Sequence, residues 1–341
     1  MRVGIPQGLF YVYYYPLWKT FFTDLGVEVL STPPSNRKII DQGIAHAVDE
    51  TCFPVKVYFG HIAELCQEEM DYLFVPRFVS VERKHYICPK FMGVPDMVRA
   101  SFTKLPPLLS PLVDLSRTDK HWRKEIMKVG RHFTWRGKKI EQAYQHGMEE
   151  LERFRQLTRQ GYSPPEALLV WEGKKLPLPG KGDLNIGVLG HGYALYDEAI
   201  SMGLIKRLRE MECNVYMVEM IEKSYIESRA ATLPKRVFWT LGRKIAGSAL
   251  YLHQQTDIDG LIYLACFGCG PDSLIGDLVK RNMQDKPYMM LTVDEHSGEA
   301  GINTRLEAFC DMLRRRRINS ESNLPTYGQL LYSLQGSVEG P

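Results

Sequence analysis

The chain has 341 residues, of which 44% are hydrophobic and 24% charged, a balance typical of a globular protein with room for two domains. Its formal net charge of +3 is too small to indicate a nucleic-acid partner or a membrane surface. No run of about 18 apolar residues predicts a membrane span, and the first residues lack a signal peptide, so we expect a cytoplasmic protein.

The first part of the chain alternates short apolar runs with helical segments. Ser35 is the residue that we expect to cap the second of these helices. The predicted elements are strands at 2–6, 27–32 and 71–81, and helices from about Pro16, over 35–48 and over 54–66. Strands that alternate with helices indicate a parallel sheet with helices on both faces.

A second alternating block begins at Asp183. Before it, residues 117–161 are polar and helical in period from Ile140, and a linker rich in proline and glycine follows. The predicted strands of the second block lie at 184–192, 214–220, 260–265 and 287–295, and its helices at 197–211, 235–255, 271–285 and 303–317. The expected organisation is an N-terminal α/β domain over 1–116, a helical connector and linker over 117–182, a C-terminal α/β domain over 183–319 and a tail over 320–341.

Seven cysteines in a chain of this size argue against a disulfide framework and leave core thiols, a redox pair or a metal site. Four of them share a local context: Cys52, Cys88, Cys266 and Cys269. Cys52, Cys88 and the Cys266–Cys269 pair are each followed by a proline within two residues. Cys52 and Cys269 directly precede predicted helices, and Cys266 leaves a predicted strand. Helix N-termini offer free N–H groups and a positive dipole end, which stabilise thiolates and a thiolate-bound iron–sulfur cluster.

The spacing of these four cysteines leaves several kinds of site open. A zinc site usually has two C-x-x-C pairs, whereas this chain has one. A redox pair would use Cys266 and Cys269 and leave the other two unexplained. The remaining alternative is that the four cysteines are ordinary core residues and lie at the ends of strands by chance. The last three cysteines, Cys66, Cys213 and Cys310, lie where a small buried hydrophobic residue would serve as well.

Five stretches of the sequence carry a family resemblance. They are AVDETCFPVKVYFGHI, DYLFVPRFVSVERKHYICPKFMGVPDMVR, GVLGHGYALYDEAISMGLIKRL, CFGCGPDSL and VDEHSGEAGINTRLEAF. In this order they resemble the acyl-CoA dehydratase activase-related family, which is similar in plan to the 2-hydroxyacyl-CoA dehydratase subunits and the double-cubane cluster proteins. The resemblance covers about 1–110 and about 183–315.

The resemblance implies two Rossmann-like, doubly wound parallel-sheet domains that face each other across a cleft. It implies an iron–sulfur cluster in that cleft, with Cys52, Cys88, Cys266 and Cys269 as ligands. Four cysteines in motif positions favour a single 4Fe–4S cluster, while a double-cubane cluster shared by a homodimer stays open. An ATP-hydrolysing activase would deliver low-potential electrons, because this chain has no phosphate-binding motif of its own. The substrate would be an acyl-CoA or another small molecule.

Three polar residues at predicted strand exits are candidate catalytic residues. His191 could protonate a substrate oxygen or donate to a cluster sulfide, and Glu295 and His296 could relay protons or bind a metal. The ordinary alternatives are that His191 is a hydrogen-bonded turn residue and that the segment around Glu295 and His296 caps the following helix. Cations around Cys88 could steer an acidic partner, hold an anionic substrate or form a solvated loop: they are Arg77, Arg83, Lys84 and Lys90.

Two other classes of function remain as alternatives at this point. The first is a scaffold stabilised by zinc or a cluster, which docks the activase without redox chemistry. The second is a two-domain module that binds a small molecule and carries incidental thiols.

Overall fold

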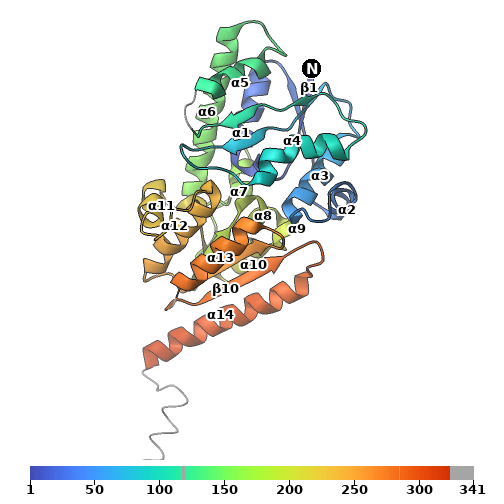
Figure 1. Ribbon diagram of the computed structural model, residues 1–341. Coiled ribbons are helices and arrows are strands. Elements are labelled where there is room, and N and C mark those ends of the chain that lie inside the picture. The colour runs from blue at the N-terminus through green and yellow to red at the C-terminus, as the bar shows by residue number, and fades with distance from the viewer. Residues whose placement is uncertain (117–119, 284, 323–341) are drawn as a thin grey trace, which may run out of the picture.

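The computed structural model describes residues 1–116, 120–283 and 285–322, which form two α/β halves and a helical connector (Figure 1). The expected fold class is therefore confirmed. Within these residues, no helix is both long enough and apolar enough to cross a membrane.

The N-terminal half is built on a parallel sheet with the strand order β2-β1-β3-β5. Its strands are β1 (Arg2–Ile5), β2 (Glu28–Ser31), β3 (Tyr72–Phe74) and β5 (Leu108–Leu109), and β4 (Arg77–Ser80) pairs with β6 (Leu112–Asp114) in a separate parallel ladder. The single strand predicted over 71–81 is wrong, because it is split at Pro76 into β3 and β4. Proline has no N–H to donate to a ladder, so it interrupts the pairing there.

The helices of this half are α1 (Tyr11–Asp24), α2 (Arg37–His46), α3 (Phe53–Leu65) and α4 (Pro89–Ser101). Helix α1 begins at Tyr11, so Pro16 lies inside it and does not start it as expected. Ser35 was expected to cap α2, but Asn36 does so by accepting a hydrogen bond from Ile39 N–H.

The connector contains α5 (Lys120–Gly130), α6 (Gly137–Arg159) and α7 (Pro164–Trp171). Helix α6 packs along α1, and Gly147 permits the close approach because a Cβ there would lie 2.7 Å from the carbonyl oxygen of Leu17. The segment expected to be a plain linker holds α7, whose first turn is closed by a capping box between Ser163 and Glu166.

The C-terminal half is built on a second parallel sheet with the order β10-β9-β7-β8. Its strands are β7 (Leu184–Gly190), β8 (Cys213–Met217), β9 (Gly260–Cys266) and β10 (Tyr288–Val293). Its helices are α8 (Gly192–Leu195), α9 (Glu198–Ser201), α10 (Leu204–Glu210), α11 (Lys223–Ala230), α12 (Thr240–Gln254), α13 (Gly270–Asn282) and α14 (Glu299–Ser322), with a 3₁₀ turn, η1 (Val218–Met220). Helix α14 runs past the expected start of the tail at 320, and residues 323–341 of that tail lie outside the described residues.

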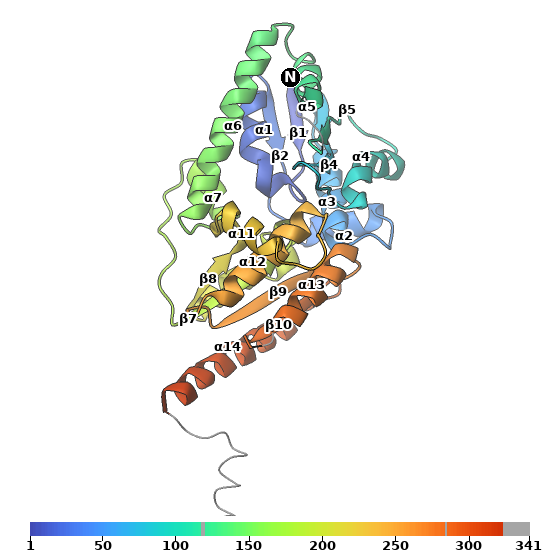
Figure 2. The same cartoon turned by 60° about the vertical axis from the view of Figure 1, so that its left-hand side comes forward.

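Strand β9 is buried along its whole length, as a central parallel strand should be. Its side chains alternate between two packing environments. Leu261, Tyr263 and Ala265 pack with residues of α12 and α13. Gly260 lies against Phe309 and Leu313 of α14, so that helix covers the other face of the sheet (Figure 2).

Both main sheets have the same plan, in which the first strand of the half lies between its second and third strands. The winding direction reverses between β1 and β3, and again between β7 and β9. In such sheets, ligands bind outside the carboxyl ends of the strands at this switch point.

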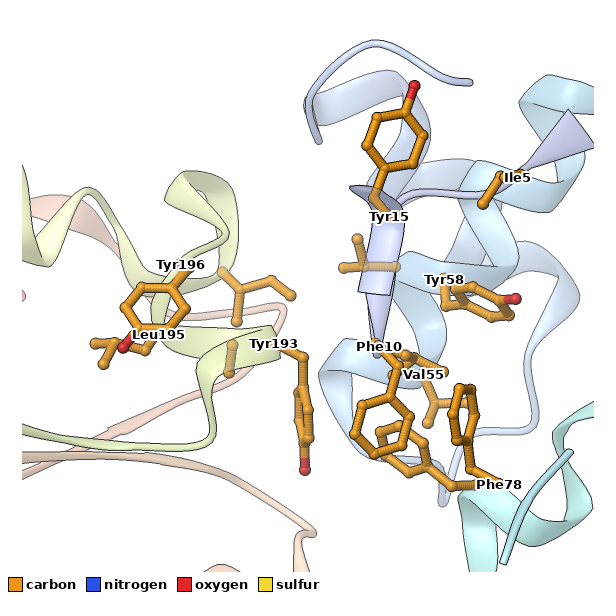
Figure 3. Close-up of a cluster of buried hydrophobic side chains, with 14 of the residues drawn as sticks. Ile5, Phe10, Tyr15, Val55, Tyr58, Phe78, Tyr193, Leu195 and Tyr196 are labelled. Atoms are coloured by element: carbon orange, nitrogen blue, oxygen red, sulfur yellow. The ribbon is translucent and has the colours of Figure 1, made fainter. Parts of the chain in front are cut away.

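Aromatic side chains join the two halves next to this edge. Figure 3 shows Tyr193 of α8 facing Phe10 and Phe78 of the N-terminal half. The ring of Tyr193 lies 5.2 Å from that of Phe91 in α4. The Tyr13 hydroxyl also accepts a hydrogen bond from the backbone N–H of residue 192 (3.0 Å), so polar and apolar contacts hold the halves together.

Candidate metal centre

Three of the four candidate ligand cysteines are the N-cap residues of helices. Cys52 precedes α3, Cys88 precedes α4 and Cys269 precedes α13, each with an extended backbone and with no hydrogen bond from its thiol to the helix. A proline lies in the first turn of each helix, where its missing N–H costs nothing. The thiols therefore stand at three helix N-termini, where backbone N–H groups of the first turn favour their ionised form.

The fourth cysteine, Cys266, is the last residue of β9 and lies at the switch point between β7 and β9. The backbone N–H of Cys269 donates to the carbonyl oxygen of Cys266 (3.1 Å), so a tight turn holds the C-x-x-C pair. Gly268 in this turn has φ +74°, a conformation that favours glycine.

Burial raises the pKa of all four thiols, and neighbouring cysteines raise that of Cys52, Cys266 and Cys269 further. A Cys52 thiolate raises the pKa of both Cys266 and Cys269, and a Cys88 thiolate raises that of Cys52 and Cys269. Such electrostatic effects fall off with distance, so we expect these cysteines from both halves to lie near one another. These raised pKa values favour the protonated thiols in the absence of a bound metal.

His191 lies in the same locality and is 4% exposed. Its Nδ1 donates a hydrogen bond to Oδ1 of Asp272 (2.7 Å), a residue in the first turn of α13. Asp272 also accepts from the Tyr263 hydroxyl (2.8 Å) and from the backbone N–H of Cys266 (3.1 Å). Although burial opposes ionisation, His191 and these hydrogen bonds hold the pKa of Asp272 below its usual value.

Asp272 is a site residue that sequence reasoning missed. One ligand atom each from His191, Cys269 and Asp272 lie within 4.8 Å of one another, so these three could hold a metal ion. The available signal was an acidic residue three positions after the C-x-x-C pair, at the start of a predicted helix. Its importance comes from His191, 81 residues away, which no local pattern connects to it.

The other two candidate catalytic residues have different surroundings. Glu295 follows β10 and forms an ion pair with Lys56 of α3, one turn after Cys52. His296 is exposed, and its backbone N–H donates to the side chain of Asp294. Glu295 is thus tied to the helix that starts at Cys52, whereas His296 faces solvent.

The cations around Cys88 divide into two groups. Lys90 lowers the pKa of Cys52 and of Cys88, against the larger opposing effect of burial. Arg77 is engaged by Asp96 of α4 (2.7 Å), while Arg83 and Lys84 are exposed. Only Lys90 of these four is therefore tied electrostatically to the cysteines within the described structure.

Ser35 takes part in a buried polar chain between the halves. Its hydroxyl donates to Asp197, which caps α9, and its oxygen lies 2.8 Å from Nε2 of His61. Nδ1 of His61 lies 2.7 Å from the hydroxyl of Thr32. Burial lowers the pKa of His61 to about 3, so the imidazole is neutral near pH 7.

Two hollows lie beside the candidate centre. A small pocket is lined by Cys88, His191 and Tyr193, together with Leu241 and other residues. A larger cavity of about 730 Å³ lies between α1, α6, η1 and the start of α12, and Leu241 lines it as well. A small molecule in the larger cavity would thus be separated from the centre by the side chain of Leu241.

The donor set fits a cysteine-ligated metal group. Four free thiols are the ligand number of a cubane cluster or of a structural zinc site. The helix N-termini and Lys90 supply positive potential for an anionic cluster, and a bound metal would offset the cost of ionising buried thiols.

Comparison with protein families gives a match over most of the chain. The model of the CoA enzyme activase uncharacterised domain matches residues 2–221. The chain belongs to this family. The expected resemblance to the acyl-CoA dehydratase activase-related family is thereby confirmed, and the matched region includes Cys52, Cys88 and His191 but ends before Cys266.

Comparison with individual proteins adds little to the family assignment. No curated protein matches the chain. Among solved structures, the chain is similar to the glutamate racemase isoform RacE1 from Bacillus anthracis, with 11% identity over 93% of this chain and 82% of that chain. The TM-score of 0.20 is too low to support an argument about fold or activity.

Proposed function

We propose that this member of the CoA enzyme activase uncharacterised domain family is an iron–sulfur electron-transfer component related to the 2-hydroxyacyl-CoA dehydratases. It accepts low-potential electrons from a separate ATP-hydrolysing activase. One observation carries the proposal: three free cysteines from both halves stand at helix N-termini, and a fourth ends the central strand β9 at the switch point of its sheet.

The side chains of this site have separate roles in the proposal. Cys52, Cys88, Cys266 and Cys269 would hold a 4Fe–4S cluster, which supplies one-electron transfer at low potential. Nδ1 of His191 is engaged by Asp272, so Nε2 is the nitrogen left to exchange a proton with a molecule in the small pocket. Asp272 positions the ring and fixes which nitrogen faces the pocket, as carboxylates do for histidines at metal sites.

The larger cavity is the proposed site for the electron acceptor. Its walls come from both halves and combine tyrosine rings with aliphatic and charged side chains. About 730 Å³ is within the usual range for a small-molecule site. The side chain of Leu241 lines both this cavity and the small pocket that holds His191 and Tyr193, so it would have to move for a bound molecule to reach them.

The proposal is tested by anaerobic purification and reconstitution with iron and sulfide. We expect a brown protein with about four iron and four sulfide per chain, as for a single cubane. Reduction should require the activase and ATP together, and it should be followed by loss of visible absorption. A colourless protein with no bound iron after reconstitution would contradict the proposal.

A zinc-stabilised scaffold is the second candidate, because His191, Cys269 and Asp272 present nitrogen, sulfur and oxygen donors within 4.8 Å. Zinc accepts this mixture of ligands. The two candidates differ in their ligand sets. One zinc per chain that survives Cys52→Ser but is lost in Cys269→Ser would favour the scaffold, whereas loss of metal in both variants favours the cluster.

A further inference from the structure

Two of the cysteines that sequence reasoning treated as ordinary core residues lie in contact. The sulfur atoms of Cys213 and Cys310 are 3.7 Å apart, although 97 residues separate them in the chain. Cys213 is the first residue of β8 and Cys310 lies in α14, and they are 3% and 1% exposed. Both thiols are free, so the pair is a buried dithiol held by two regular elements.

The two thiols share one contact and one nearby cation. Their mutual contact is the largest influence on the pKa of each, burial raises both values, and Arg314 lowers both. The thiol of Cys213 also lies 3.6 Å from the carbonyl oxygen of Met211, to which it can donate. Arg314 is held in place by Asp183 (2.7 Å) and by the carbonyl oxygen of Met211 (2.6 Å). A neighbouring cation favours the thiolate, and a second thiol in contact can convert a sulfenic acid into a disulfide.

This pair is separate from the candidate metal centre. Cys213 lies opposite Leu184 at the amino end of the second sheet, whereas Cys266 lies at the carboxyl end, two residues beyond the Gly190–Leu264 pair. Eight residues at roughly 3.3 Å each place the two sites about 25 Å apart along the strands. Chemistry at Cys213 and Cys310 therefore leaves the ligands of the other site in place.

We propose that Cys213 and Cys310 form an oxidation site whose substrate is a small peroxide. The thiolate of one of the two cysteines attacks a peroxide oxygen, the O–O bond breaks, and one water leaves after proton uptake, which gives a sulfenic acid. The sulfur of the other cysteine then attacks the sulfenic sulfur, the S–O bond breaks, and the thiol proton leaves with a second water. The net change is the two-electron oxidation of two thiols to a disulfide and the reduction of hydrogen peroxide to two waters. A dithiol reductant restores the pair.

Burial gives the site its selectivity. Because the two residues are 3% and 1% exposed, a small peroxide is favoured over a bulky disulfide such as oxidised glutathione. The product joins α14 covalently to β8 at the amino end of the sheet. Since the crosslink closes a long loop of the unfolded chain, it should raise the midpoint of thermal unfolding of the oxidised protein.

The test uses the full-length protein, treated with hydrogen peroxide, with oxidised glutathione or with neither, and then denatured in an alkylating reagent. Peptide mass mapping without reduction should show the Cys213 and Cys310 peptides joined after peroxide, with the loss of two hydrogen atoms. Dithiothreitol should reverse the crosslink, and oxidised glutathione should form it several-fold more slowly. Metal content does not enter this readout, so failure of the proposed function would leave it intact.

Matched variants separate the proposal from general thiol damage. Cys66 is half-buried and lies far along the chain from either partner, so Cys66→Ala should keep the crosslink, whereas Cys310→Ala should abolish it and leave Cys213 alkylated. Arg314→Met should slow crosslinking several-fold, and Arg314→Lys should restore most of the rate because it keeps the charge. Recovery of both Cys213 and Cys310 as free thiols, at a peroxide dose that oxidises Cys66, would overturn the proposal.

Discussion

Lys56 Nζ lies 2.5 Å from Glu295 Oε1, and this ion pair joins α3 of the N-terminal half to the loop after β10 of the C-terminal half. The two side chains are 7% and 15% exposed. Burial opposes the ionisation of Glu295, but Lys56 holds its pKa below the usual value. The pair thus holds α3, which follows Cys52, against the second sheet, in which strand β9 ends at Cys266.

Lys56→Met should destabilise the protein by up to about 3 kcal/mol, because it leaves the partly buried Glu295 carboxylate without a partner. The double variant Lys56→Met, Glu295→Leu should recover much of this loss, since both charges are then gone. Urea unfolding measures the three free energies. Arg37→Ala breaks an exposed ion pair with Asp41 and should cost no more than about 1 kcal/mol. Equal effects of Lys56→Met and Arg37→Ala would show that the interdomain pair is not effectively buried.

Gly60→Ala should destabilise α3 and lower metal binding at Cys52. A Cβ at Gly60 would lie 1.8 Å from the carbonyl oxygen of Ile39, so α2 and α3 would have to separate. Overpacking of this kind costs about 1–3 kcal/mol, which thermal unfolding can measure. Gly93→Ala is the control in α4, because its Cβ would meet only Met97 Sδ at 3.8 Å. We expect it to be neutral or to stabilise by up to about 1 kcal/mol, and a loss as large as that of Gly60→Ala would contradict the packing argument.

His61 should make the protein less stable as the pH falls. Its pKa is about 3 in the folded state, well below the ordinary histidine value of 6.5, so below that ordinary value the unfolded chain binds a proton that the folded protein does not. The contribution of His61 is therefore complete above the unfolded pKa and is lost as the pH falls toward the folded one. Between about pH 8 and pH 5 this amounts to about 2 kcal/mol.

His61→Gln should remove this part of the pH dependence, whatever its effect on stability at pH 8. Urea unfolding at the two pH values measures the difference for each variant. His121→Gln, at an exposed position, is the matched control and should keep the slope of the wild type. A wild-type slope that persists in His61→Gln would show that other groups cause the acid sensitivity.

Serine replacement of any of the four candidate ligands should lower the iron content of the reconstituted protein. The ligands are Cys52, Cys88, Cys266 and Cys269, and we expect their sulfur atoms to lie within roughly 7 Å of one another around a cubane, given metal–thiolate bonds of about 2.3 Å. The triple replacement of Cys66, Cys213 and Cys310 should leave iron and sulfide unchanged. Loss of half of the iron in that triple variant would instead indicate a larger cluster with more ligands.

The exposed cations Arg83 and Lys84 should speed the encounter with an acidic activase. Their joint replacement by Ala should slow reduction of the cluster at low salt and matter much less at high salt, because ions screen the attraction. Stopped-flow reduction at two ionic strengths measures this. If these residues hold substrate instead, reduction stays unchanged while turnover falls. An unchanged rate of both steps would show that they form an ordinary solvated loop.

The sequence by itself determined the alternation of strands and helices and the family to which the chain belongs. It also placed Cys52 and Cys269 ahead of helices, because strand and helix periods and a proline in the first helical turn depend only on neighbouring residues. Local reasoning was wrong where a neighbour in space competed with a neighbour in sequence. Ser35 has the chemistry of a helix cap, but Asp197 and His61 engage it, and Asn36 caps the helix.

Only the tertiary structure decided which distant side chains meet. Asp272 meets His191 across 81 residues, and Cys213 meets Cys310 across 97. The first pair forms because β7 and β9 are adjacent in the sheet, so the residues that follow them share one edge. The second forms because α14 packs back across the sheet onto the start of β8. Strand order and helix docking result from the packing of the whole core, and no short stretch of sequence encodes that packing.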